Sequence, residues 1–323
     1  MRVLIINRLE RARSLDTLYE GVAEHLDDVT VVKLSKLQIE NLPGTLETMD
    51  LSGYDRVLVD IPVRRAAHAL KQLNRISGLV YYEEDAYQEF MGVSKFHGEF
   101  LNFFKALGGA PVIVSGYNIA NYLNANGITA YCIPKAYDDR HLSNFNSPRD
   151  IALAFVGRIN NKVYSERKNL LDAMASAVDL QTLRTETAEE YLALLNRIRC
   201  FFSADIGFDE YMAKNFEAMA CGCLLIAKRQ PSEDAQLGFI DMVNVVHYDT
   251  ADEAIEKYRL LQADPLRLEA IARAGEELAL GRHRLSMRSA NFAGVISADY
   301  PQRQPAEVKR AGWLAPLRAL LRR

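Results

Sequence analysis

Residues 200–229 read CFFSADIGFDEYMAKNFEAMACGCLLIAKR, and this stretch decides the fold class. Its first eight residues are a strand-like run, its last six are an apolar strand, and the segment between them has the spacing of an amphipathic helix. A helix that joins two buried strands in this way is the crossover of a parallel sheet. The stretch therefore predicts an α/β unit of the Rossmann type.

Two carboxylates mark the helical segment. Asp209 stands eight positions before Glu217, a little over two helical turns, so both are expected near one face of a helix that begins just after Asp209. The free N–H groups of that helix would face the crevice at the carboxyl end of a strand, where a diphosphate is best held. Carboxylates accept hydrogen bonds from sugar hydroxyls, so the pattern suits a nucleotide-sugar. The alternative is an ordinary crossover helix with a solvated Glu217.

The run FEAMACGCLLIA, residues 216–227, resembles the donor-binding signature of the retaining glycosyltransferases with the GT-B fold, the group 1 or family 4-like superfamily. That signature has a Glu, seven residues and a second Glu, whereas Asp209 takes the first position here, with Glu210 beside it. The match leans toward the CgeB-like spore-maturation branch, and its motifs cover about residues 151–295. The resemblance implies that Asp209 or Glu210 binds hydroxyls of the donor sugar and that Glu217 binds the ribose.

A second strand-like run, IALAFVGR at 151–158, ends in a glycine followed by basic residues. Gly157 lets the backbone approach a ligand without a Cβ in the way, and basic side chains can neutralise a leaving diphosphate. The segment resembles the superfamily's FVGR…K motif, which implies that Arg158 and Lys162 contact the donor diphosphate, with Arg167 as a third contact. The alternative is a solvated basic loop that caps the sheet.

The acceptor side is expected in the first half of the chain. Glu83, Glu84 and Asp85 follow an apolar run and should lie at the carboxyl end of the fourth strand. A carboxylate there can orient an acceptor hydroxyl or stabilise positive charge on the donor sugar. The alternative is a solvated loop in which Asp85 caps a helix. The three arginines of residues 8–13 either recognise an anionic acceptor or form a solvated loop.

The predicted chemistry is electrostatic, with basic groups and a helix N-terminus holding the diphosphate as negative charge grows on it. The resemblance implies no divalent metal and no cofactor other than the donor itself. The predicted catalytic residues are Arg158, Lys162 and Asp85. The predicted donor-binding residues are Gly157, Arg167, Asp209, Glu210, Lys214, Asn215 and Glu217.

Strand-length apolar runs alternate with helix-period segments along the whole chain, which predicts parallel sheets covered on both faces. A polar, Pro-containing segment interrupts the alternation before it restarts near residue 150. The fold class is therefore α/β, a GT-B arrangement of two Rossmann-like domains facing a central cleft. The predicted parts are an acceptor-side domain at 1–140, a linker at 141–150, a nucleotide-sugar domain at 151–283, a crossover helix at 284–300 and a basic amphipathic tail at 301–323.

Composition limits the function classes. The chain has 323 residues, 49% of them hydrophobic, with a net charge of −3, so no general affinity for nucleic acid is expected. No apolar run is long enough for a transmembrane helix, and the N-terminus lacks the features of a signal peptide. Four cysteines without metal-site spacing fit reduced thiols. A cytoplasmic protein is expected.

The tail has a composition of its own. Residues 301–323 carry six Lys or Arg and one Glu, and their leucines and Trp313 form one apolar stripe. This pattern describes an interfacial helix on an anionic membrane, and the alternative is a helix docked on its own domain or on a partner. Membrane association would suit a lipid-linked acceptor.

The sequence thus predicts a glycosyltransferase that moves a sugar from a nucleoside-diphosphate donor to a hydroxyl of a glycan or lipid-linked acceptor in cell-surface polysaccharide or glycolipid synthesis. Retention at the anomeric carbon follows from the resemblance alone. A GT-B epimerase or phosphorylase and a catalytically degenerate sugar-nucleotide-binding scaffold stay open. A dinucleotide oxidoreductase is disfavoured because no G-x-G-x-x-G follows either opening strand.

Overall fold

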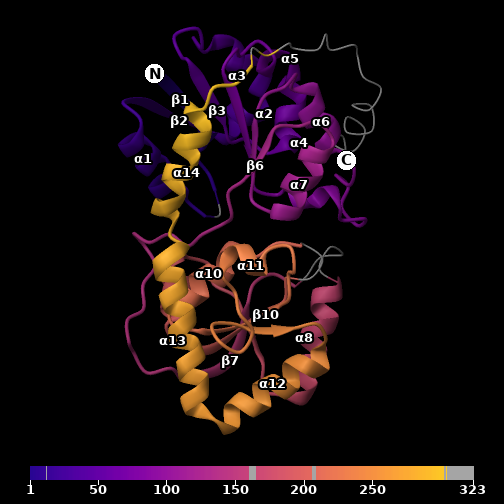
Figure 1. Cartoon of the computed structure of the whole chain (residues 1–323), viewed down its shortest axis with the longest axis vertical. Coiled ribbons are helices and arrows are strands. Elements are labelled where there is room, and N and C mark those ends of the chain that lie inside the picture. Colours follow the sequence, from indigo (N-terminus) through magenta and orange to yellow (C-terminus); the bar gives the residue numbers. More distant parts are fainter. Residues whose placement is uncertain (12, 160–164, 206–208, 302, 304–323) are drawn as a thin grey trace.

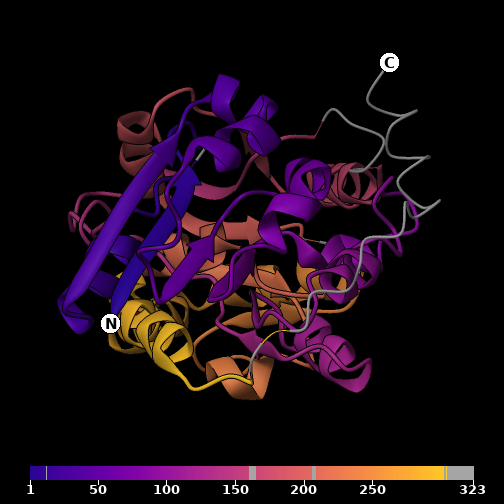
Figure 2. The same ribbon diagram turned by 90° about the horizontal axis from the view of Figure 1, so that it is seen from above.

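The computed structural model describes residues 1–11, 13–159, 165–205, 209–301 and 303. The described chain forms two parallel sheets, one in each half, and the halves follow one another along the long axis of the molecule (Figure 1). Seen from above, the N-terminal half lies over the C-terminal half (Figure 2). The predicted α/β class with two Rossmann-like units is confirmed.

The sheet of the N-terminal half is built around β1, whose residues are buried on both faces because helices cover each side. In register, Ile5 of this strand lies beside Val31 on one neighbour and Leu58 on the other. In spatial order the strands are β2 (Asp28–Leu34), β1 (Arg2–Arg8), β3 (Arg56–Val59), β4 (Leu79–Glu83), β5 (Val112–Val114) and β6 (Ala130–Cys132).

Alternate residues of β1 enter different cores. Leu4 and Ile6 pack into one apolar cluster with Phe103, whereas Val3 and Ile5 face a second cluster on the other side of the sheet. The helices and 3₁₀ segments of this half are α1 (Asp16–His25), α2 (Lys36–Glu40), α3 (Leu42–Thr48), α4 (Val63–Ala66), η1 (Ala67–Ala69), α5 (Leu70–Leu73), η2 (Ala86–Glu89), α6 (Phe100–Ala106) and α7 (Tyr117–Ala125).

The sheet of the C-terminal half repeats this plan, with apolar clusters on both of its faces. Its central strand has a parallel neighbour on each side, with Cys200 beside Leu153 on one and Leu224 on the other. In spatial order the strands are β11 (Val246–Tyr248), β10 (Leu224–Lys228), β9 (Ile198–Ser203), β7 (Ile151–Val156) and β8 (Gln181–Leu183).

Side-chain caps define several helix starts of this half. Thr187 caps the helix that follows β8 in a capping box, and Asp264 accepts a hydrogen bond from the Arg267 amide just before a helix with Pro265 at its first position. The helices are α8 (Ser165–Ala177), α9 (Ala188–Leu195), α10 (Ala213–Ala220), α11 (Asp234–Leu237), α12 (Ala251–Ala263) and α13 (Pro265–Arg282).

The last described helix, α14 (Leu285–Ser297), returns to the N-terminal half and packs on α1 (Figure 1). The hydroxyl of Ser289 donates to the Leu18 carbonyl oxygen at 3.0 Å, and a Cβ at Gly21 would lie 2.3 Å from that hydroxyl oxygen. The two helices therefore approach so closely that only glycine fits at this point. None of the described helices is long and apolar enough to cross a membrane.

The two chain segments that join the halves are bonded to each other. The Tyr137 amide donates to the His283 carbonyl oxygen at 3.0 Å, and the Leu285 amide donates to the Tyr137 carbonyl oxygen at 2.8 Å. The buried imidazole of His283 donates to the Leu237 carbonyl oxygen and accepts from Arg288, each at 2.9 Å. Burial lowers the pKa of this histidine to about 3, so the imidazole stays neutral and its role is structural.

Candidate functional site

The start of α10 differs from the sequence prediction. Met212 is the extended N-cap residue and the helix begins at Ala213, not directly after Asp209. Asp209 itself has φ 51°, in the left-handed region that aspartate tolerates better than most residues. The chain turns there before the helix can form. The expectation that Asp209 and Glu217 share one helical face is therefore wrong.

The two acidic residues ahead of α10 contact the other half of the molecule. The Asn118 amide of α7 donates to the Asp209 carboxylate. The Glu210 carboxylate is paired with the ammonium of Lys135 and accepts from the Ser115 hydroxyl at 3.2 Å. Both candidate sugar-binding carboxylates thus have protein partners that join the C-terminal half to the N-terminal half.

The first turn of α10 carries two polar side chains, Lys214 and Asn215, whose contacts differ from those of Asp209 and Glu210. Asn215 is 1% exposed, and among the described residues neither atom of its side-chain amide has a hydrogen-bond partner. The Lys214 ammonium lies 3.9 Å from Asp205 and 5.2 Å from the centre of the Phe155 ring. Burial lowers the pKa of Lys214. A buried amide without a partner beside a helix N-terminus is a fitting place for a polar ligand.

Glu217 is held one turn further along α10. Its Oε2 accepts from the Tyr191 hydroxyl of α9 at 2.9 Å. Burial raises the pKa of Glu217, while Arg13, from the other half, is near enough to lower it. Burial also raises the pKa of Tyr191 well above its usual value, so the phenol stays a donor. The carboxylate is thus oriented by a partner that is permanently protonated.

The end of β7 approaches this turn. A Cβ at Gly157 would lie 3.1 Å from the Lys214 ammonium, so the missing side chain lets strand end and helix come together. Arg158 is exposed. Arg167 is buried, and its guanidinium donates to the carbonyl oxygens of Ala204 and Arg158 at 3.0 and 3.1 Å.

Arg167 also contacts Asp205 at 3.3 Å, so its position is inside the protein between two strand ends. Lys162, a predicted catalytic residue, lies outside the described residues. The structure thus brings Gly157, Lys214, Asn215 and Glu217 to one region, with Arg158 at its exposed edge.

On the N-terminal side, two of the arginines that follow the core of β1 are held in ion pairs and are not solvated. Arg11 pairs with Asp60 and, at 2.6 Å, with Glu84, and Arg13 pairs with Glu84 as well. Arg8 is more distant, at 3.9 Å from Asp60. Burial would raise the pKa of Glu84, but the two guanidinium groups outweigh it and lower the pKa to about 2. This buried ion-pair network corrects the predicted solvated loop, whereas recognition of an anionic acceptor by these arginines stays a prediction.

The acidic run at the end of β4 divides into three different environments. Glu83 is buried and accepts from the backbone amides of Val63 and Asp85 at 2.8 and 3.0 Å. Glu84 belongs to the network just described. Asp85 is exposed and precedes η2, but its side chain makes no capping hydrogen bond. Among the three, Asp85 is the carboxylate accessible to an acceptor.

Sequence reasoning gave no functional role to Lys135, Ser115 or Tyr191. Lys135 carried a signal, because the run IPKAYDD at 133–139 resembles the superfamily's IPNGVD segment, in which an asparagine stands at the position of Lys135. Ser115 and Tyr191 carried none, since each becomes relevant through a contact with a residue remote in the chain.

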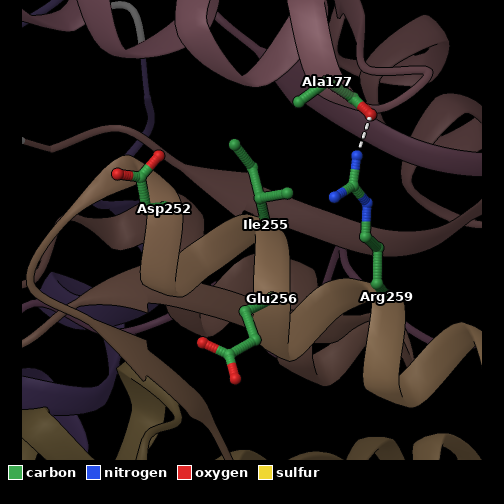
Figure 3. Close-up of a pocket in the computed structure, with 5 residues that line it drawn as sticks. All are labelled: Ala177, Asp252, Ile255, Glu256 and Arg259. Carbon is green, nitrogen blue, oxygen red and sulfur yellow. Dashed lines mark hydrogen bonds between the residues drawn. The ribbon is translucent and has the colours of Figure 1, made fainter.

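An open hollow of about 360 Å³ lies elsewhere, between the C-terminal end of α8 and the outer face of α12 (Figure 3). In it Arg259 donates to the Ala177 carbonyl oxygen at 2.9 Å, with Asp252 and Glu256 exposed to solvent nearby. Its surface is shallow and carries none of the residues described above.

Comparisons with known proteins agree with this geometry. Residues 142–294 match a family model described as glycosyl transferase-like. No curated protein sequence matches the chain. Among solved structures, sucrose-phosphate synthase from Thermosynechococcus elongatus superposes with a TM-score of 0.67 at 13% identity, over 91% of this chain and 98% of that one.

Two further solved structures superpose on nearly the whole chain. Anabaena HepE in complex with UDP and glucose has a TM-score of 0.59 at 15% identity, over 93% of this chain and all of that one. The T4 phage β-glucosyltransferase has a TM-score of 0.58 at 12% identity, over 92% and 100%. At these identities the likeness concerns the fold, which is GT-B.

Proposed function

We propose that this chain acts as a glycosyltransferase of the GT-B superfamily. It moves a hexosyl-type sugar from a nucleoside-diphosphate donor to an acceptor hydroxyl, with retention at the anomeric carbon. The activity class follows from the matching glycosyl transferase-like domain. Retention, the donor and the acceptor are the proposed part, as is a role in cell-surface glycan or glycolipid synthesis.

The first turn of α10 is the observation that carries the proposal. The N-terminus of α10, the Lys214 ammonium and the side-chain amide of Asn215, which has no hydrogen-bond partner among the described residues, lie near Gly157, directly after β7. A helix N-terminus with a nearby cation favours a diphosphate, and a buried amide can bind its oxygens or the nucleoside. HepE and the phage enzyme, which share the fold, have been captured with UDP or UDP-glucose, and this supports a nucleotide-sugar donor here.

Catalysis would then consist of stabilising the departing diphosphate. Arg158, Lys214 and the α10 N-terminus hold the diphosphate as negative charge develops, and Lys162 is a further proposed contact. Glu217 accepts hydrogen bonds from the ribose hydroxyls, oriented by Tyr191. The acceptor hydroxyl approaches from the side of Asp85, and its proton passes to the leaving phosphate oxygen as the new glycosidic bond forms. No metal or further cofactor takes part in this scheme.

The experiment that tests the proposal is a screen of sugar nucleotides. UDP-, GDP-, ADP- and dTDP-sugars should differ in how far they raise the melting temperature, and the best one should be hydrolysed slowly without acceptor. Turnover to an epimeric sugar nucleotide would instead indicate an epimerase, and stabilisation without any turnover would indicate a binding scaffold. If no nucleoside diphosphate stabilises the protein, the proposed function fails.

The tail extends the proposal to a peripheral site on an anionic membrane, with a lipid-linked acceptor. This prediction falls on residues 305–323, which lie outside the described residues, and it rests on their basic, amphipathic sequence. Deleting these residues should abolish cosedimentation with anionic liposomes at low salt and leave donor binding intact. A full-length protein that ignores such liposomes would show that the tail has another role.

A further inference from the structure

The segment that leads into α10 is held from the other half of the molecule at several points. Asp209 contacts Asn118 of α7, and Glu210 contacts Ser115 and Lys135, which follow β5 and β6. In addition, the Glu233 carboxylate accepts from two backbone amides, that of Tyr211 at 2.8 Å and that of Tyr117 at 3.2 Å. The donor-side segment and the start of α7 are therefore tied together across the boundary.

Lys135 is the cation at the centre of this contact. Its side chain is 7% exposed, and its ammonium donates to the Glu84 carbonyl oxygen and the Ser115 hydroxyl, each at 3.0 Å, as well as to Glu210. Two of these acceptors directly follow strands, Glu84 after β4 and Ser115 after β5, and the third, Glu210, precedes α10. An ammonium has three protons to donate, so the three contacts satisfy it completely.

The space for the Glu210 carboxylate exists because residue 116 is glycine. A Cβ at Gly116 would lie 2.5 Å from Oε2 of Glu210 and 3.4 Å from its Cβ. The backbone of Gly116 is extended, so alanine could adopt the same conformation and would act through its methyl group alone. The carboxylate thus occupies a volume that one added carbon would fill.

We infer that Lys135 is a positioning residue of the donor site: by holding Glu210 across the boundary, it fixes the segment from Asp209 to Met212 and thereby the N-terminus of α10. This inference rests on the proposed function only for the statement that α10 binds the donor. It assigns Glu210 to the connection between the halves, and not to the donor sugar.

The ionisation of Glu210 should make the effect of Lys135 depend on pH, which a role in packing alone would not do. Burial raises the pKa of Glu210 to about 7, although Lys135 lowers it. Further titratable groups near Glu210 are Asp85, after β4, Glu233, before α11, and the Cys132 thiol of β6, and the two carboxylates oppose its ionisation. Glu210 is therefore an anion that needs Lys135 above about pH 7, and is largely neutral at pH 5.

The first test uses hydrogen exchange of the full-length protein without ligand. Lys135→Met should lower the protection of the Tyr211 amide at least tenfold at pH 8 relative to wild type, and by much less at pH 5, where Glu210 needs no counter-charge. The double variant Lys135→Met/Glu210→Gln should recover most of the protection at pH 8. Equal losses at both pH values would mean that Lys135 acts only through packing, and the inference would fail.

A steric variant tests the same inference without changing any charge. Gly116→Ala should reproduce the loss of protection at Tyr211, whereas Gly92→Ala, at a site where an added Cβ meets nothing within 4 Å, should not. Wild-type protection in the Gly116 variant would overturn the assignment of Glu210 to this contact.

The second arm measures UDP and GDP affinity by calorimetry at pH 8 on the same proteins. Whichever nucleotide binds the wild type should bind Lys135→Met and Gly116→Ala about tenfold more weakly. Unchanged affinity in variants that lost protection would show that the segment does not position the donor site. If wild type binds neither nucleotide nor any other nucleoside diphosphate, the proposed function fails, while the exchange results still decide whether Lys135 positions the segment.

Discussion

The strand ends of the two halves both gather polar side chains, but they differ in whether those side chains have partners. In the N-terminal half, the Glu84 carboxylate is bonded to Arg11 and Arg13, and every one of these charges is matched. In the first turn of α10, the Asn215 amide has no partner among the described residues, and Lys214 has a single distant carboxylate.

We expect this difference to separate residues that build the boundary between the halves from residues that bind the proposed donor. A buried polar group without a hydrogen bond costs stability, so proteins retain such groups chiefly where a ligand or water completes them. A fully paired network is in contrast strongly destabilised when one partner is removed. The two clusters should therefore respond oppositely to substitution, one in stability and the other in binding.

The largest effect is expected at Glu84. Glu84→Gln removes the anionic partner of Arg13 and leaves Arg11 with Asp60 alone, and should lower the free energy of unfolding by about 3–5 kcal/mol. Denaturant unfolding at pH 7 measures this. Glu24→Gln, on an exposed ion pair with Arg140, is the control and should change stability by less than about 1 kcal/mol. A mild effect at Glu84 would mean that the network is not the structural element described above.

The sign of the pH dependence can be worked out for the same residue. The folded pKa of Glu84, about 2, lies below the ordinary glutamate value, so its contribution is present above about pH 4.5 and is lost as the pH falls toward 2. The stability difference between wild type and Glu84→Gln should therefore shrink over that window. A difference that stays constant from pH 6 to pH 3 would contradict the assigned pKa shift.

The next effect concerns Arg158, at the exposed edge of the proposed donor site. Arg158→Ala should lower kcat/KM by roughly 2–4 kcal/mol in transition-state terms, because it removes positive charge from the departing diphosphate. Stability should be unchanged, since the side chain is exposed. Steady-state kinetics with the best sugar nucleotide check this, and full activity in a folded variant would remove Arg158 from the site.

A smaller effect should divide the two carboxylates that the sequence paired. Glu217→Gln should weaken free nucleoside diphosphate and intact donor alike, by about 1.5–3 kcal/mol, because its proposed partner is the ribose. Asp209→Asn should affect the intact sugar donor more than the free nucleotide. Calorimetry with both ligands tests the division. Equal losses for both ligands in both variants would mean that the two roles are not separate.

How far the sequence predicts this molecule depends on the range of each interaction. The alternation of apolar runs is local, and it predicts both parallel sheets. Lys214, Asn215 and Glu217 belong to one short helix, so a sequence pattern places them together without any knowledge of the rest of the fold. The likeness to glycosyl transferases covers the same part of the chain, residues 142–294.

The interactions that the sequence did not predict join residues far apart in the chain. Lys135 and Glu210 are 75 positions apart, and the sequence around neither residue indicates that the two are in contact. The start of α10 was misplaced for a related reason: the turn at Asp209 is stabilised by Asn118 from the other half. Helix propensity depends on the local sequence, so it cannot predict a contact between the two halves.

The sharpest comparison uses two asparagines that are each 1% exposed. Asn196 is satisfied: its amide donates to the carbonyl oxygens of Ser143 and Leu192, and its oxygen accepts from the Phe145 amide at 2.7 Å. Asn215 has no such partners among the described residues. If burial alone decided their roles, both changes to alanine would cost similar stability.

We expect the two variants to differ. Asn196→Ala should lower the free energy of unfolding by about 1–3 kcal/mol, because it leaves buried backbone groups unpaired. Asn215→Ala should leave stability unchanged or raise it, because it removes an unsatisfied buried amide, and should weaken nucleoside-diphosphate binding by about 1 kcal/mol. Thermal unfolding and calorimetry on both proteins decide between the outcomes. A loss of stability in the Asn215 variant without any loss of nucleotide affinity would show that its amide serves the fold and not a ligand.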